Sequence, residues 1–219
     1  MGFIRTTGII LFMYLCWRNM KENYKERQLI TYAWVALLAV MIGGRLAFGL
    51  IHFGVWNEDL IDWLLVWQKP GDNLLAGYGA LLLATLGLSK IYNWKVWAFL
   101  EDNSINIALL FMFFLVDEFL RSGFDRQPLI YLVAVLDAVT IGWWFKSKYR
   151  SFTWYKSGKK GFVFWWGNLI LWLVMAGFSF LLKDKLYMSI TYLTLSLISV
   201  IGLVILGEVF ELSVKKVKK

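Results

Sequence analysis

Seven long apolar stretches limit what this chain can fold into. They cover residues 8–17, 29–51, 74–92, 105–120, 129–145, 162–182 and 187–210. About 20 consecutive apolar residues are enough to cross a bilayer as an α-helix, and the 219 residues are 59% hydrophobic and 18% aromatic. The sequence therefore predicts an all-α, polytopic membrane protein with seven transmembrane helices in a single membrane domain over residues 1–219.

Two of the seven stretches are shorter than a bilayer requires. The first can extend back to Phe3, and the fourth would have to be buried against neighbouring helices or lie in a thinned bilayer. Arg5 precedes the first stretch as it would in a signal peptide, but the small residues of a cleavage site are missing. We expect this stretch to be the first transmembrane helix.

Basic residues are concentrated in alternate connections between the stretches. The first, third and fifth connections and the C-terminal tail contain Arg18, Lys21, Lys25, Arg27, Lys90, Lys95, Lys146, Lys148, Arg150, Lys156, Lys159, Lys160, Lys215, Lys216, Lys218 and Lys219. The opposite side has only Arg5, Lys69, Arg121, Arg126, Lys183 and Lys185. The positive-inside rule then predicts an external N-terminus and a cytoplasmic C-terminus. Topology accounts for the net charge of +8, so nucleic-acid binding is not expected.

Metal and cofactor chemistry have no support in the sequence. Cys16 is the only cysteine and His52 the only histidine. An internal disulfide needs two cysteines, and structural zinc or haem sites need clusters of such ligands. We therefore expect neither a metal nor a cofactor.

The run Gly43-Gly44-Arg45-Leu46 places a permanent positive charge within the second apolar stretch. A guanidinium is costly in hydrocarbon, so it should face a protein interior, a wet cavity or an anionic lipid head group, and it is a functional-site hypothesis by default. The alternative is structural. Asp137 lies near the middle of the fifth stretch and needs a partner or a proton, and Arg45 is a candidate partner.

Other polar residues near the ends of the stretches are further candidates. His52 follows Arg45 by seven residues, so on a continuous helix the two share a face about 10 Å apart along the axis. His52 is either an interfacial residue or a general base. Arg121 has the spacing to pair with Asp117 or Glu118, and a self-contained ion cluster is the favoured interpretation of these three residues.

Small residues open the third stretch as Ala76-Gly77-Tyr78-Gly79-Ala80. Such residues let another helix backbone or a lipid approach closely, and they are usually packing devices. The alternative is a substrate-binding surface from which the Tyr78 hydroxyl projects.

Two connections have an interfacial composition. Residues 52–73 form an acidic, tryptophan-rich external segment that includes Trp67, and residues 59–67 are either a short amphipathic surface helix or an aromatic belt loop. Residues 146–160 form a basic cytoplasmic loop in which aromatic residues alternate with cations. This loop suits contact with the anionic inner leaflet.

The features above occur in a definite order along the chain. After the basic first connection they are Gly43-Gly44-Arg45-Leu46, Trp67-Gln68-Lys69-Pro70-Gly71, Ala76-Gly77-Tyr78-Gly79, Asp102, Pro128-Leu129-Ile130-Tyr131, Lys159-Lys160-Gly161 and a glycine-containing stretch over 198–207. This order resembles that of the bacterial prolipoprotein diacylglyceryl transferases, seven-span enzymes with the same N-out, C-in orientation. The resemblance covers nearly the whole chain.

Three motifs of that family have no counterpart here. Ala76 or Tyr78 stands where the family has the histidine of a His-Gly-Gly run. Residues 117–121 stand near the place of a Gly-Arg-x-Gly-Asn motif, and Gly177-Phe178-Ser179-Phe180 stands where the family has arginines and a glutamate. These differences lie at chemically important positions.

The resemblance implies transfer of a diacylglyceryl group from phosphatidylglycerol to the lipobox cysteine of a prolipoprotein in the bacterial plasma membrane. Arg45 would then bind the lipid phosphate with Arg121 as a second donor, and Tyr78 or His52 would replace the missing histidine as the base. The substrate-binding candidates are Gly77, Gly79 and Trp67. The partners implied are phosphatidylglycerol, the prolipoprotein signal peptide and membrane lipids.

Two alternatives remain for the function. The first is a catalytically inactive relative that binds phospholipid or a lipoprotein precursor, which the missing motifs favour. The second is a small membrane transporter, which predicts broken helices or polar stripes in two related halves. The sequence has neither pattern.

Overall fold

A computed structural model describes the chain except for residues 1–2, 52–72, 122–125, 147, 153–154, 156, 158, 182–185 and 208–219. For residues 51, 121, 126–128 and 187 it describes the backbone only. The chain divides into two compact units, Met1–Val96 and Trp97–Lys219, called the first and the second unit from here on.

The described residues form seven α-helices and one 3₁₀ helix, with no β-strand among them. The helices are α1 (Phe3–Met20), α2 (Glu26–Ile51), α4 (Leu74–Ile91), α5 (Val96–Arg121), α6 (Arg126–Lys146), η1 (Tyr149–Ser151), α7 (Phe162–Leu181) and α8 (Leu186–Gly207). The all-α expectation is confirmed for this part of the chain. Six helices, α2 and α4 to α8, are long and apolar enough to cross a membrane, as in a multi-pass membrane protein.

The fourth apolar stretch belongs to a longer helix than its apolar residues indicated. Helix α5 begins at Val96 rather than at residue 105 and has 26 residues. The added turns contain Glu101, Asp102 and Asn103, and both Glu101 and Asn103 are buried. The requirement for a thinned bilayer therefore disappears, because the helix continues through polar residues that the protein interior accommodates.

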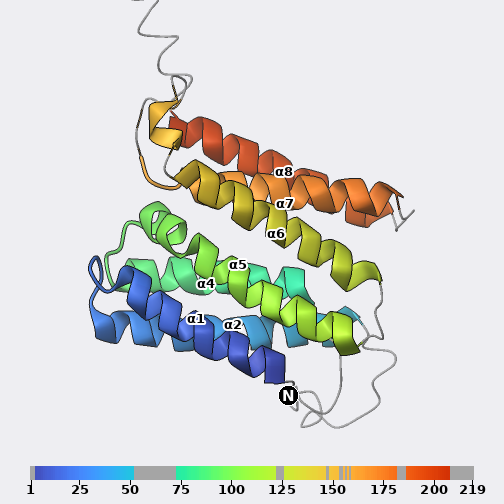
Figure 1. Ribbon diagram of the computed structural model, residues 1–219, viewed down its shortest axis with the longest axis horizontal. Coiled ribbons are helices and arrows are strands. Elements are labelled where there is room, and N and C mark those ends of the chain that lie inside the picture. Colours follow the sequence, from blue (N-terminus) through green and yellow to red (C-terminus); the bar gives the residue numbers. More distant parts are fainter. Residues whose placement is uncertain are drawn as a thin grey trace, which may run out of the picture. The chain divides into compact units, whose positions relative to one another are not determined.

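In the first unit, α2 packs against both α1 and α4 (Figure 1). The short connection 21–25 folds α1 back along α2 as a hairpin. Two polar contacts between α2 and the α4 region add to the apolar packing. The Tyr32 hydroxyl lies 3.3 Å from Thr85 Oγ1, and Trp94 Nε1 donates to Gln28 Oε1 at 3.3 Å.

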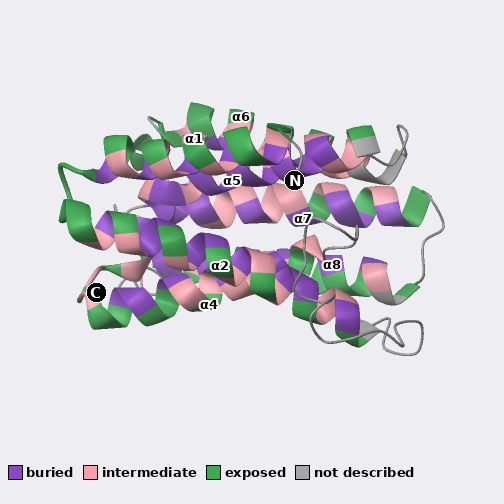
Figure 2. Cartoon of the chain, turned by 90° about the horizontal axis from the view of Figure 1, so that it is seen from below, coloured by how far each residue is buried: buried purple, intermediate pink, exposed green. Residues whose placement is uncertain are grey.

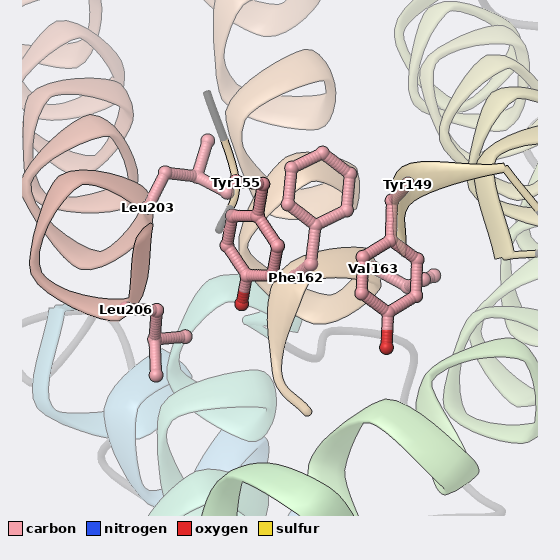
Figure 3. Packing of buried hydrophobic residues seen from close by; sticks show 6 residues of the cluster. All are labelled: Tyr149, Tyr155, Phe162, Val163, Leu203 and Leu206. Atoms are coloured by element: carbon pink, nitrogen blue, oxygen red, sulfur yellow. The ribbon is translucent and has the colours of Figure 1, made fainter. Parts of the chain in front are cut away.

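In the second unit, α7 packs against both α6 and α8. The core at one end of these helices is aromatic: the rings of Tyr149 and Tyr155 flank Phe162 (Figure 3), with centroid distances of 5.0 and 4.9 Å. Ser157 Oγ donates to the Leu206 carbonyl at 2.6 Å. The connection between α6 and α7 is therefore fastened to the end of α8.

Buried and exposed residues alternate along the helices (Figure 2). Large apolar side chains are widely exposed, including Leu83, Trp143 and Ile205 at 70%, 72% and 68%. Water would penalise so much exposed apolar area, but hydrocarbon does not. These faces have the character of lipid-facing surfaces.

Candidate functional site

Glycines of α2 and α4 allow these two helices of the first unit to pack closely against each other. A Cβ atom on Gly77 would lie 3.0 Å from the Val40 carbonyl oxygen, and one on Gly44 would lie 3.2 Å from the Asn73 carbonyl oxygen. A Cβ on Gly43 would collide with the Ala80 side chain. The small residues are therefore required for close contact between the two backbones.

The start of α4 is fixed against this glycine pair of α2. Asn73 N donates to the Gly44 carbonyl at 3.0 Å, and the Asn73 side chain accepts a hydrogen bond from Ala76 N at 3.0 Å. Asn73 is thus the N-cap of α4. Asn73 therefore links the start of α4 to Gly44, the residue before Arg45.

Two arginines are buried in the first unit. Arg45 is 4% exposed in α2, and Arg5 is 8% exposed in α1. Arg5 lies near the start of α1 and Arg45 near the end of α2, so both are at the end of the hairpin far from connection 21–25. Both guanidinium groups are permanent positive charges inside the protein, where a charge is costly unless other groups compensate it.

The other predicted site residues differ from Arg45 in burial and packing, or lie outside the described residues. Tyr78 is half-buried in α4. Gly77 is the packing residue just described, whereas a Cβ on Gly79 would meet no atom within 4 Å. His52, Trp67 and the side chain of Arg121 lie outside the described residues. The structure thus brings Gly77 to the segment preceding Arg45.

The two carboxylates considered as structural partners have different environments. Asp117 is buried in α5, with 4% of its surface exposed. Asp137 is exposed on α6, where its carbonyl oxygen accepts a hydrogen bond from Thr140 Oγ1 at 3.1 Å. The Asp137 side chain is therefore not buried among other side chains.

A second polar centre, which the sequence did not indicate, surrounds Glu101 at the start of α7. The Glu101 side chain is 3% exposed. Its Oε1 accepts from the Tyr149 hydroxyl at 2.9 Å, and its Oε2 accepts from Gly161 N at 2.6 Å and Val163 N at 3.3 Å. The carboxylate therefore caps the N-terminus of α7, where the helix dipole favours negative charge.

Tyr149 and Tyr155 have raised pKa values next to this centre. Burial is the main cause for both side chains, and it raises the pKa of Tyr155 to about 12. Arg150 donates from Nε to the Tyr149 hydroxyl oxygen at 3.5 Å, and this bond is the largest cause of a raised pKa for Arg150. At neutral pH the tyrosines are therefore neutral hydrogen-bonding groups, and Arg150 is a cation.

An ion pair lies beside the Glu101 centre. Lys160 Nζ is 3.3 Å from both carboxylate oxygens of Asp102, and the two side chains are 38% and 15% exposed. Because Asp102 is partly and Lys160 substantially exposed, solvent weakens this pair. It contributes less than the buried contacts of Glu101.

Sequence reasoning missed Glu101 because its partners are distant in the chain, at separations of 48 residues for Tyr149 and 60 for Gly161. Two sequence features could have indicated this centre. Glu101 is a carboxylate close to the fourth apolar stretch, and Lys159-Lys160-Gly161 directly precedes the sixth. In the part of the chain that the structure describes, no three His, Cys, Asp or Glu side chains converge as metal ligands would.

Comparisons of the chain with models of protein families, with curated proteins and with solved structures gave no match.

Proposed function

We propose that this protein is a diacylglyceryl-transferase-like protein of the bacterial plasma membrane, in which Arg45 binds the phosphate of phosphatidylglycerol. One observation carries the proposal. Arg45 is buried, at 4% exposure, directly after the two glycines that pack against the start of α4. A permanent cation in the protein interior, away from bulk water, is suited to binding a phosphate.

The proposed reaction makes specific demands on the site. A lipobox thiol loses its proton to a base, and the thiolate attacks the glyceryl carbon that carries the phosphate ester. A carbon–sulfur bond forms, the carbon–oxygen bond breaks, and glycerol phosphate leaves with the electron pair. A fixed cation next to the phosphate stabilises the charge that develops on this leaving group.

Arg5 is a further candidate for the phosphate. It is buried at 8% exposure and lies at the same end of the α1–α2 hairpin as Arg45. Arginine presents several donors in a planar fork that matches phosphate oxygens. We therefore add Arg5 to Arg45 as a candidate phosphate-binding residue, with Arg121 retained from the sequence.

Two residues are candidates for the base. Tyr78 follows Gly77 in α4 and is half-buried, but a phenol ordinarily titrates near pH 10, so it accepts protons poorly at neutral pH. His52 is the other candidate. The absence of the family's histidine from 76–79 favours, as a second candidate function, an inactive relative that binds the lipid without turnover.

Complementation of a bacterial strain depleted of its own transferase tests the activity. We expect the intact chain to restore growth and thiol lipidation. Arg45→Ala should reduce lipidation about 10- to 100-fold, because a hydrogen bond to a charged group contributes about 1.5–3 kcal/mol. The matched control is Arg18→Ala, which removes an exposed arginine of α1 and should leave lipidation unchanged at equal membrane abundance.

Retention of phosphatidylglycerol by the purified chain separates the two candidate functions. Failure to complement, combined with phosphatidylglycerol binding of which Arg45→Ala removes a fraction, would support the inactive relative. If neither lipidation nor phosphatidylglycerol binding depended on Arg45, both functions would be wrong.

A further inference from the structure

The end of α6 combines exposed tryptophans with exposed cations. Trp143 and Trp144 are 72% and 55% exposed, and Lys146, Lys148 and Arg150 follow them and are also exposed. We call these five residues the cationic–aromatic surface. Tryptophan favours the boundary between hydrocarbon and water, and basic residues favour anionic head groups at the same depth.

Two of the cations are positioned by neighbouring rings. Lys148 Nζ lies 4.4 Å from the centre of the Trp144 ring, a cation–π geometry. The Arg150 guanidinium carbon lies 5.8 Å from the centre of the Tyr149 ring. Lys148 and Arg150 are therefore exposed cations that each lie next to an aromatic ring.

Arg150 is connected to the buried Glu101 carboxylate through the Tyr149 hydroxyl. Arg150 Nε donates to the Tyr149 hydroxyl oxygen at 3.5 Å, and that hydroxyl donates to Glu101 Oε1 at 2.9 Å. Tyr149 is 1% exposed. The Glu101 centre thus fixes the ring and hydroxyl on which Arg150 rests, so the guanidinium is partly ordered before any ligand binds.

An exposed apolar stripe leads along α6 to this surface. Leu129, Val133 and Leu136 are 43%, 38% and 39% exposed, and with Trp143 they have the spacing of one helix face. Thr140 is the exposed polar residue of this face, and its hydroxyl is satisfied by the Asp137 carbonyl oxygen. This stripe suits an acyl chain, and the cations at its end suit a phosphate. Asp137, also exposed, lies about two turns before Trp144, at the depth of the chains and away from the cations.

We infer that the cationic–aromatic surface binds the head group of an anionic phospholipid whose acyl chains lie along α6. The apolar stripe favours a membrane lipid over a soluble phosphate, which would need only the cations. This surface shares no residue with the Arg45 site. The inference therefore does not depend on the proposed transferase function.

Native mass spectrometry of the full chain, extracted from nanodiscs that contain phosphatidylglycerol and phosphatidylcholine, tests the inference. In the double variant K148Q/R150Q we expect the affinity for phosphatidylglycerol to fall about 25-fold, which is about fivefold for each charge lost at an anionic membrane surface. Retention of phosphatidylcholine should not change.

The double variant K90Q/K95Q is the matched control. It removes the same charge from two exposed lysines of the first unit and should retain phosphatidylglycerol like the unaltered chain. Arg45→Ala should leave intact the part of phosphatidylglycerol retention that depends on Lys148 and Arg150. A failure of the Arg45 proposal can therefore be told apart from a failure of this inference. Equal losses in the two double variants, equal retention of both lipids, or displacement of phosphatidylglycerol by excess inorganic phosphate would each overturn the inference.

Discussion

The Glu101 carboxylate shows how this protein accommodates a charged side chain in its interior. Removing a carboxylate from water costs several kcal/mol unless hydrogen bonds compensate. Two backbone N–H groups at the start of α7 and the Tyr149 hydroxyl donate to it. In return, the carboxylate accepts hydrogen bonds from Gly161 N and Val163 N, which would otherwise have no acceptor within the helix. Glu101 therefore joins α5, η1 and α7 through one side chain.

Replacing Glu101 tests this role. Glu101→Gln removes the negative charge and replaces one accepting oxygen by an NH₂ group, whereas the two backbone N–H groups and the Tyr149 hydroxyl all donate to the native carboxylate. Because at least one of these charge-assisted hydrogen bonds is lost or reversed, we expect a loss of about 1–3 kcal/mol in the free energy of unfolding. Asp102→Asn is the neighbouring control and should cost less than about 1 kcal/mol, because its ion pair with Lys160 is partly exposed. Denaturant titration of the purified protein in detergent measures both changes, and equal effects would contradict the central role of Glu101.

The packing of α2 against α4 requires glycine at position 77 but not at position 79. Helices in a bilayer gain no hydrophobic energy by leaving lipid for each other, so close packing has to hold them together. Gly77 faces the Val40 carbonyl oxygen of α2, whereas Gly79 faces open space. The two glycines have the same local sequence character and different structural roles.

Alanine substitutions distinguish the two glycines. Gly77→Ala forces the α2 backbone away, and we expect it to destabilise the protein by about 1–3 kcal/mol, as overpacking usually does. Gly79→Ala meets no neighbour and should be neutral or stabilise by up to about 1 kcal/mol through helix propensity. Unfolding in a detergent series measures the pair. An equal loss in both variants would show that packing against α2 is not the cause.

For the whole molecule, the number of spans depends on α1. Six helices are long and apolar enough to cross a membrane. The 18 residues of α1 cover about 27 Å as a helix, close to the thickness of the hydrocarbon core. Arg5 and Arg18 lie near its two ends, and Arg5 is buried. Burial of Arg5 within the protein makes a seventh span compatible with its charge.

Cysteine labelling tests the seventh span. In a Cys16→Ala background, we introduce Phe3→Cys or Lys95→Cys at positions that are exposed in the structure. Seven spans place these positions on opposite sides of the membrane, so a membrane-impermeant maleimide applied to intact spheroplasts should label only Phe3→Cys. Six spans, with α1 outside the bilayer, place both positions on one side, and identical labelling would exclude the seven-span topology.

The amino-acid sequence predicts the apolar helices, although α5 begins before its apolar stretch. A helix in lipid must satisfy its backbone hydrogen bonds internally, so each apolar stretch of sufficient length already specifies its own local structure. Helix α7 accordingly begins at Phe162, where its apolar stretch begins. The small residues at 76–80 likewise indicated a close approach, and Gly77 makes one.

The contacts between polar groups and the choice of the essential glycine depend on how the helices pack together. The donors to Glu101 lie 48, 60 and 62 residues away in the chain, and Gly77 differs from Gly79 in having the α2 backbone opposite it. No local pattern contains this information, because it depends on how each helix is rotated against its neighbours. In lipid, packing and hydrogen bonds between helices set that rotation.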